Sequence, residues 1–239
     1  NDADGLMSKA NTLYTMGNYD EALVFFKKYS EKVPDDEFGY LHQALCLINK
    51  SQFEESIELL KKAVSVAAVE SVYLPEIYQE MSFAYSKLGN LEKSLWCIDM
   101  TDNLECDHVH MTVVKGHILL TNKKDEEAQK EFNKALELSN NDPKVQLKII
   151  ISFHDNSHLN FAYKLYQEFF KTVGEDYNEG YSYFALCCKD MKKDEEFLYY
   201  LKEACERNPE EAKAILGEYF PEDLNPKDYY NYALEHLND

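Results

Sequence analysis

The sequence predicts an all-α protein, an α-solenoid of about six helical hairpins that ends in C-terminal capping helices. Two observations support this fold class. Gly (8) and Pro (6) are scarce for 239 residues, which favours helices with short connections over a β-rich sandwich. A small residue also recurs inside similar segments, such as GNYDEALVFF and GNLEKSLWCI, at a spacing that is most often 34 residues.

The repeat contains two columns of small residues and a column of large ones. Antiparallel helices approach closely where side chains are short, so the small columns predict the crossing point within each hairpin. The large column is expected to fill the core around that crossing. The first small column is Ala22, Ser56, Ser94, Ala128, Ala162 and, as a large exception, Phe197. The second, 12 residues earlier, is Ala10, Ala44, Ser82, Gly116, Ile150 and Ala185, of which five of six are small. The large column is Phe26, Leu60, Ile98, Phe132, Tyr166 and Leu201.

Six repeats follow from this register, each expected to be one hairpin. In the first and third, Gly17 and Gly89 are expected to close the turn between the two helices. The fifth repeat is the most degenerate, because Ile150 and Phe169 stand where small residues are expected. The predicted repeats span residues 3–36, 37–74, 75–108, 109–142, 143–177 and 178–211.

Residues 212–239 are predicted to be capping helices that cover the apolar face of the last repeat. The segment EEAKAILGEYF predicts a short helix that ends before Pro221, and Asn225 and Pro226 predict the start of another. One apolar stripe is expected on that second helix, formed by Tyr230, Ala233, Leu234 and Leu237. No matching cap precedes Leu6 and the chain begins at Asn1 instead of Met, so we expect the sequence to be the C-terminal part of a longer array.

The chain resembles the tetratricopeptide repeat family, whose unit of about 34 residues is a pair of antiparallel helices with a small–Gly/Ala–aromatic–Ala–Pro signature. The resemblance covers residues 3–211. It is strongest in repeat four, with GHILLTNKKDEEAQKEFNKALEL, and in repeat six, which ends EACERNP. It implies a right-handed α-solenoid in which the first helix of each repeat lines a concave groove.

The resemblance also implies which residues face that groove, at positions 2, 5, 9 and 12 of each first helix. Many of these residues are apolar here, and exposed apolar surface of this extent tends to mark an interaction site. The alternative is that a tightly wound superhelix buries them against neighbouring helices. The predicted partner-binding residues are Phe38, Leu41, Leu45, Ile48, Phe83, Val113, His117, Leu147, Ile151, His154, Leu186 and Lys189.

Some relatives bind a C-terminal carboxylate through Lys and Arg on successive first helices, and this sequence departs from that pattern. The corresponding positions carry Met7, Asn11, His42, Glu76 and Glu80. Two glutamates would repel a carboxylate, so we expect no carboxylate clamp in this groove.

The sequence therefore predicts a non-enzymatic scaffold that binds an apolar or amphipathic segment of a protein or peptide in its groove. No phosphate-binding loop, GxSxG elbow or HExxH motif occurs, and no cofactor is expected. The CDHVH segment at Cys106 holds metal-ligand residue types, but a structural zinc site usually needs four well-placed ligands and no metal site is predicted. Two alternatives remain: a glycan-binding accessory module that uses exposed aromatic residues, and a self-associating assembly subunit or homo-oligomer.

The net charge of −19 weighs against two classes of partner. An acidic surface repels the nucleic-acid backbone and anionic membrane surfaces, so binding to either is not expected. No run approaches the roughly 20 apolar residues of a membrane span, so no membrane insertion is expected. The six cysteines contain no CxxC pair and mostly fall in apolar helical patterns, which favours free thiols in a reducing compartment. We therefore expect a cytoplasmic protein.

Overall fold

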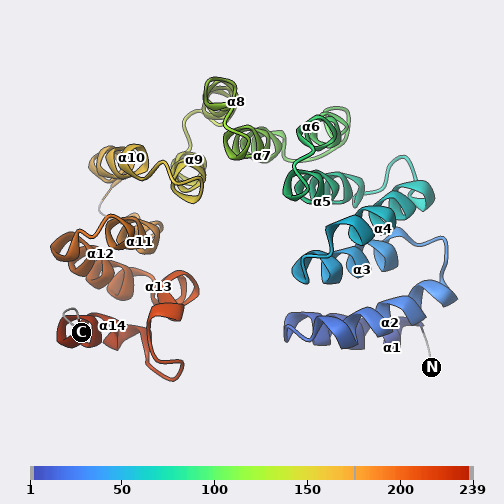
Figure 1. The fold of residues 1–239 in the computed structure, drawn as a ribbon, viewed down its shortest axis with the longest axis horizontal. Helices are drawn as coiled ribbons and strands as arrows, with labels where there is room; N and C mark the ends of the chain where they lie inside the picture. Colours follow the sequence, from blue (N-terminus) through green and yellow to red (C-terminus); the bar gives the residue numbers. More distant parts are fainter. Residues whose placement is uncertain (1–2, 175, 237–239) are drawn as a thin grey trace. The chain divides into compact units, whose positions relative to one another are not determined.

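The computed structural model describes residues 3–174 and 176–236, and these form fourteen α-helices, two short 3-10 turns and no strand (Figure 1). This agrees with the all-α, hairpin-based fold class. The helices are α1 (Ala3–Thr15), α2 (Tyr19–Lys32), α3 (Glu37–Asn49), α4 (Phe53–Val66), α5 (Leu74–Lys87), α6 (Leu91–Asp99), α7 (His108–Thr121), α8 (Asp125–Leu138), α9 (Pro143–Asp155), α10 (Leu159–Thr172), α11 (Tyr181–Asp190), α12 (Asp194–Arg207), α13 (Pro209–Leu216) and α14 (Tyr229–His236).

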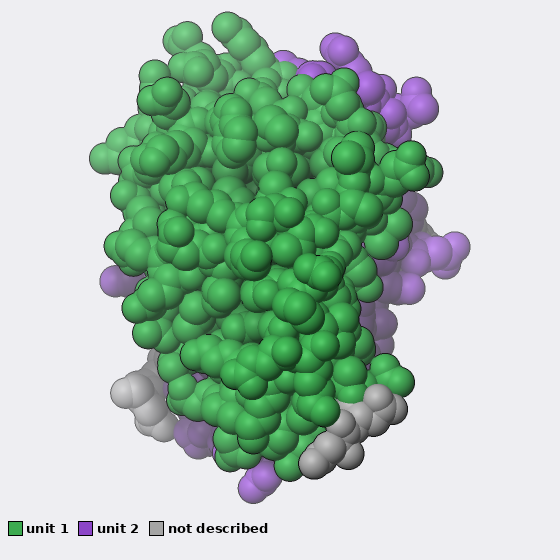
Figure 2. All heavy atoms as spheres, turned by 90° about the vertical axis from the view of Figure 1, so that its right-hand side faces the viewer, with its two compact units in different colours: residues 1–131 green, residues 132–239 purple. Residues whose placement is uncertain are grey.

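The chain divides into two compact units, residues 1–131 and residues 132–239, which are coloured separately in Figure 2. Helix α8 runs through the division. Within the first unit, α1 packs on α2, α3 on α4 and α5 on α6, and each hairpin also packs on the next. Within the second unit, α9 packs on α10 and α11 on α12. None of the helices in the described ranges is long and apolar enough to cross a membrane.

The predicted small residues lie at buried crossings between paired helices. Ala22, Ser94, Ala128 and Ala162 are fully buried, and Phe197 is buried as well despite its size. The third hairpin shows the contact directly, since the Ser82 hydroxyl donates to the Ser94 carbonyl at 2.8 Å and the Ser94 hydroxyl donates to the Ser82 carbonyl at 2.9 Å. Short side chains thus bring the two backbones together, as their spacing predicts.

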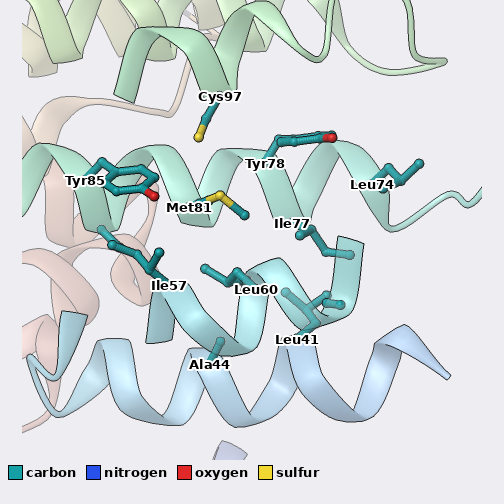
Figure 3. Packing of buried hydrophobic residues seen from close by; sticks show 12 residues of the cluster. Leu41, Ala44, Ile57, Leu60, Leu74, Ile77, Tyr78, Met81, Tyr85 and Cys97 are labelled. Carbon is teal, nitrogen blue, oxygen red and sulfur yellow. The ribbon is translucent and has the colours of Figure 1, made fainter. Parts of the chain in front are cut away.

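The large column fills the core beside these crossings. Phe26, Leu60, Phe132, Tyr166 and Leu201 are fully buried. Figure 3 shows Leu60 among the side chains that join α3, α4, α5 and α6. Burying such side chains contributes roughly 1.5–3 kcal/mol each, so this column provides a large share of the free energy of folding.

Each turn that joins two paired helices contains one residue with a left-handed backbone. Gly17 and Gly89 have φ angles of 76° and 72°, as their predicted place in the turn requires. Four other turns have the same conformation at a residue that has a Cβ atom. These residues are Ser51 (φ 59°), Lys123 (φ 59°), Ser157 (φ 64°) and Lys192 (φ 57°).

Aromatic packing explains much of the tyrosine and phenylalanine content of the second unit. The ring of Phe184 on α11 lies 4.1 Å from the ring of Tyr200 and 5.0 Å from that of Tyr166. The ring of Phe170 also stacks on the ring of Phe184, with 5.8 Å between the ring centres. These rings belong to α10, α11 and α12, so one aromatic cluster joins two consecutive hairpins.

The helices α13 and α14 pack on α12. The Asn225 side chain accepts a hydrogen bond from the Lys227 main-chain N–H at 3.0 Å, which caps the short turn before α14. The predicted apolar stripe is right for Ala233, which is buried, and wrong for Leu234, which is 54% exposed, while Tyr229 is buried in its place at 2% exposed. The ring of Tyr229 stacks on Phe220 at 4.0 Å and this contact sets the rotation of the helix. Leu237 lies outside the described residues.

All six cysteines are free thiols, and five of them are buried. Burial raises the pKa of the Cys46, Cys97, Cys187 and Cys188 thiols to about 12. A thiol with so high a pKa is almost entirely protonated near neutral pH and behaves as a small apolar side chain.

Candidate functional site

The first unit contains an open groove between the first helices of its successive hairpins. Its volume is about 480 Å³. The helices α1, α3, α5 and α7 each contribute side chains, and α5 lies between α3 and α7. The lining residues are Tyr14, Leu45, Ile48, Asn49, Gln79, Glu80, Phe83, Ser86, Lys87, Val114, His117, Ile118 and Thr121.

Phe83 is the main apolar side chain that the groove presents to solvent. It is 41% exposed, although most large apolar side chains of α5 are buried. The ring of Phe53 lies 6.2 Å away in an edge-to-face arrangement and supports it from α4. Leu45 and Ile48, both half-buried, line the same groove from α3. The groove therefore offers an aromatic ring and two aliphatic side chains to a ligand.

Several polar groups of the groove are already paired within the protein. The Asn49 amide donates to the Tyr14 hydroxyl at 3.1 Å and to the Leu45 carbonyl at 2.8 Å, which ties α3 to α1. The Gln79 side-chain oxygen lies 3.1 Å from Nε2 of His110, which ties α5 to α7. These contacts hold neighbouring first helices at the rim of the groove.

Glu80 differs from these groups. Among the described residues no hydrogen bond or ion pair reaches its carboxyl group, although the side chain is half-buried and lines the groove. Burial, together with repulsion from Glu76 one turn earlier on α5, raises the pKa of the Glu80 carboxyl to about 7. Burial also raises the pKa of Glu76. The groove thus has an acidic group that forms no ion pair within the part of the chain that the structure describes.

Lys87 lines the groove with a positively charged side chain. Its ammonium group lies 5.1 Å from the centre of the Phe83 ring on the preceding turn of α5, a cation–π contact. His42, which lies near the groove on α3, has its pKa lowered by burial, and its ring stacks on Phe38 at 3.8 Å.

Four of the predicted partner-binding residues line this groove: Leu45, Ile48, Phe83 and His117. Four others are buried in the packing between helices, where a partner could not touch them: Leu41 (0% exposed), Val113 (5%), Leu147 (5%) and His154 (7%). Phe38 is half-buried between the rings of Tyr29, His42 and Tyr73.

The remaining three predicted residues belong to the second unit. Ile151 and Leu186 are half-buried and line none of the cavities described here. Lys189 lines a second cavity of about 410 Å³ beside the C-terminal helices, and its ammonium group lies 4.1 Å from the centre of the Tyr219 ring. The other lining residues of that cavity are Lys192, Asp194, Phe197, Phe220, Tyr232, Ala233 and His236.

The sequence pattern missed several lining residues that share one property. Each follows a position of the family template by one residue, which moves it about 100° around the helix axis. The groove face of α3, α5 and α7 is therefore wider than the template, because it includes template positions such as Leu45 and Phe83 together with the residues that follow them. The missed residues are Asn49, Glu80, Lys87, Val114, Ile118 and Thr121.

Among the described residues no group of three or more His, Cys, Asp or Glu side chains could hold a metal ion. At the CDHVH segment, the Cys106 sulfur lies 3.7 Å from Nδ1 of His108. Asp107 instead caps α7, since its carboxylate accepts from the His110 main-chain N–H at 2.9 Å. The segment thus begins a helix.

The sequence model of the tetratricopeptide repeat matches residues 3–31, 39–69 and 111–142. The protein CTR9 homolog of Arabidopsis thaliana is 30% identical over 112 residues, which are 46% of this chain and 10% of that protein. The match thus spans about a tenth of the length of that relative.

Solved structures of similar fold extend over most of the chain. PilW, a widely conserved type IV pilus biogenesis factor, aligns with a TM-score of 0.57 at 15% identity and covers 90% of this chain and 98% of PilW. The pilF protein of Pseudomonas aeruginosa aligns with a TM-score of 0.55 at 17% identity, over 90% of this chain and 97% of pilF. MamA from Desulfovibrio magneticus RS-1 aligns with a TM-score of 0.51 at 19% identity, over 58% of this chain and 76% of MamA.

At these identities the structural likeness shows the fold alone. Each matched segment spans most of one helical hairpin, α1 with α2, α3 with α4, and α7 with α8. Three segments of the chain thus match the tetratricopeptide repeat, and the solved structures share the helical-hairpin fold.

Proposed function

We propose that the chain is a non-enzymatic interaction scaffold and that the groove of residues 1–131 binds a peptide segment of a protein partner. The observation that supports this most is the exposure of Phe83, 41% in a groove whose other apolar side chains are half-buried or buried. An aromatic ring placed in a concave, partly apolar surface is typical of a contact that carries much of the binding energy of an interface.

The contacts around Phe83 favour a pre-formed binding surface. Phe53 supports the ring from one side and the hydrogen bonds of Asn49 and Gln79 tie the adjacent helices together. A partner segment that binds here would order few protein side chains, which lowers the entropic cost of association. An amphipathic helix that lays its apolar face on Leu45, Ile48 and Phe83 fits this arrangement.

The test uses peptides, because the partner is not identified. A displayed library of random 16-residue peptides is selected against the full chain, and the binders are measured by isothermal titration calorimetry. We expect Phe83→Glu and Leu45→Glu to weaken binding at least about 100-fold, because both place a charge in the apolar contact. The matched control is Val24→Glu on α2, where the native side chain is already 48% exposed away from the groove.

Circular dichroism of each variant checks that the helices remain. If the selected peptides bind Phe83→Glu as tightly as the native chain, the groove is not the binding site and the proposal is overturned. Self-association through the groove, the alternative predicted from the sequence, is measured by light scattering at two concentrations. No observation favours the glycan-binding alternative.

The free thiols also support a proposal on location. We propose that the protein works in a reducing compartment such as the cytoplasm, because all six cysteines are unpaired and five are buried in the cores of their hairpins.

A further inference from the structure

Glu80 lines the groove with its carboxyl group outside any hydrogen bond or ion pair of the described residues. Its side chain is half-buried, and partial burial of a carboxylate without a compensating charge is unfavourable. The neighbouring charge on α5 makes the situation less favourable, since Glu76 is acidic too. A group of this kind is stabilised when a ligand brings the missing positive charge.

The surroundings of Glu80 narrow the chemistry of that ligand. Phe83, on the next turn of α5, is exposed in the same groove, and Leu45 and Ile48 lie across from it on α3. Lys87 lies over the ring of Phe83. A ligand that satisfies the whole surface therefore needs apolar side chains and a cationic group together.

We propose that the groove of residues 1–131 selects a basic amphipathic segment, in which apolar side chains cover Phe83 and Leu45 while one Lys or Arg side chain pairs with Glu80. This inference rests on the proposed function and specifies the partner. The net charge of −19 attracts a basic segment from a distance, and the Glu80 contact discriminates among the segments that arrive.

The polar and charged groups around Glu80 come from four helices of the first unit, α1, α3, α5 and α7. On α5, Glu76 adds a second negative charge and Lys87 is held over Phe83. The Tyr14 hydroxyl of α1 is near enough that Glu80 contributes to the raised pKa of that tyrosine. On α7, His117 lines the groove, whereas α3 contributes the neutral Asn49. A cation that enters thus meets the two carboxyl groups of α5, Glu76 and Glu80, whereas Lys87 is held against the Phe83 ring.

The test follows the peptides selected against the native chain. Each binder is synthesised in two forms, with its Lys or Arg and with norleucine at that position. We expect the basic form to bind Glu80→Gln about tenfold more weakly than the native chain, because one partly buried charge pair is lost. The norleucine form should bind both chains equally. The matched control is Glu70→Gln, which changes an exposed loop carboxyl of the same unit.

A second measurement reports on the carboxyl group itself. Because the pKa of Glu80 is raised to about 7, binding of a cation at pH 7 should release a fraction of a proton from it. Calorimetry of the basic peptides in two buffers of different ionisation enthalpy measures this release. We expect it in the native chain and not in Glu80→Gln, and a merely structural effect of the substitution would not abolish it.

The outcomes separate the two proposals. If Phe83→Glu abolishes binding while Glu80→Gln changes neither affinity nor proton release, the groove binds peptides but does not select a basic side chain, and this inference is overturned. If Phe83→Glu leaves binding intact, the proposed function itself fails. Selected peptides without enrichment of Lys or Arg would also overturn the inference.

Discussion

Ser82 and Ser94 hold the third hairpin together by exchanging hydrogen bonds, each hydroxyl donating to the carbonyl of the other residue at 2.8 and 2.9 Å. Both side chains are fully buried. The two hydroxyls also lie 3.0 Å apart. A buried polar pair that satisfies itself in this way allows α5 and α6 to approach as closely as two alanines would, while it fixes their register.

This contact predicts how the crossing responds to substitution. Ser94→Ala removes one satisfied hydrogen bond and should lower the free energy of unfolding by about 1 kcal/mol. Ser94→Leu should cost about 2–3 kcal/mol, because the larger side chain forces the helices apart. Urea unfolding followed by circular dichroism measures both. A Ser94→Leu chain as stable as the native one would contradict a close crossing at this point.

The backbone conformations of Gly17 and Gly5 predict changes in stability of opposite sign when each residue is replaced by alanine. Gly17 has a φ of 76° and a Cβ added there would meet no atom within 4 Å, so Gly17→Ala should cost about 1 kcal/mol through the backbone alone. Gly5 lies in α1 and also has free space around it. Gly5→Ala should therefore stabilise the chain by about 0.5–1 kcal/mol. Thermal melts of the two variants provide the comparison.

The same reasoning applies to turns that lack glycine. Lys123→Gly and Lys192→Gly place glycine where φ is 59° and 57°. Each should raise stability by about 0.5 kcal/mol, since relief of the left-handed strain exceeds the added chain entropy. A loss of stability in both variants would mean that the lysine side chains contribute more than the backbone conformation costs.

Glu80 predicts a pH-dependent gain of stability when its charge is removed. The folded chain binds more protons at this carboxyl than the unfolded chain, because the pKa rises from 4.5 to about 7 on folding. The stability contributed by this group is therefore fully present below pH 4.5 and is lost as the pH rises through about 7. Glu80→Gln should be more stable than the native chain by on the order of 2 kcal/mol at pH 8, and the difference should shrink at pH 5.

The measurement is urea unfolding at several pH values, with Glu70→Gln as the surface control. A difference between Glu80→Gln and the native chain that stays constant from pH 5 to about pH 8 would argue against a raised pKa at this position. Removing the carboxyl would thus improve the fold while it weakens the proposed binding, a trade-off typical of functional residues.

In the second unit, the contact between His154 and Asp190 predicts a loss of stability when one partner is removed. Nε2 of His154 lies 2.8 Å from the Asp190 carboxylate, and the histidine side chain is only 5% exposed. Asp190→Ala leaves the buried imidazole without this partner and should cost about 1–3 kcal/mol. The double variant His154→Leu with Asp190→Ala should recover part of that loss, because no buried polar ring remains unpaired. Equal losses in the single and double variants would show that the contact contributes little.

The hairpins could be predicted because close helix crossings restrict which side chains fit. Ala22, Ser94 and Ala162 carry that signal directly. Four of the six turns gave no signal, since Ser51 and Lys123 carry side chains that usually avoid a left-handed backbone. The groove was harder to predict because α3 packs on neighbours on several sides and is apolar almost all round, so its pattern does not separate the core face of Leu41 from the groove face of Leu45.

The buried cysteines give the protein a set of native chemical reporters along its length. Cys46, Cys97 and Cys205 belong to three different hairpins, and each reacts with an alkylating reagent only when its own hairpin opens. Cys106, which is only half-buried, serves as the fast reference. Mass spectrometry of alkylated peptides over time would therefore rank the opening free energies of the hairpins without any engineered label. Binding of a peptide in the groove should slow the reaction of Cys46 and Cys97 more than that of Cys205.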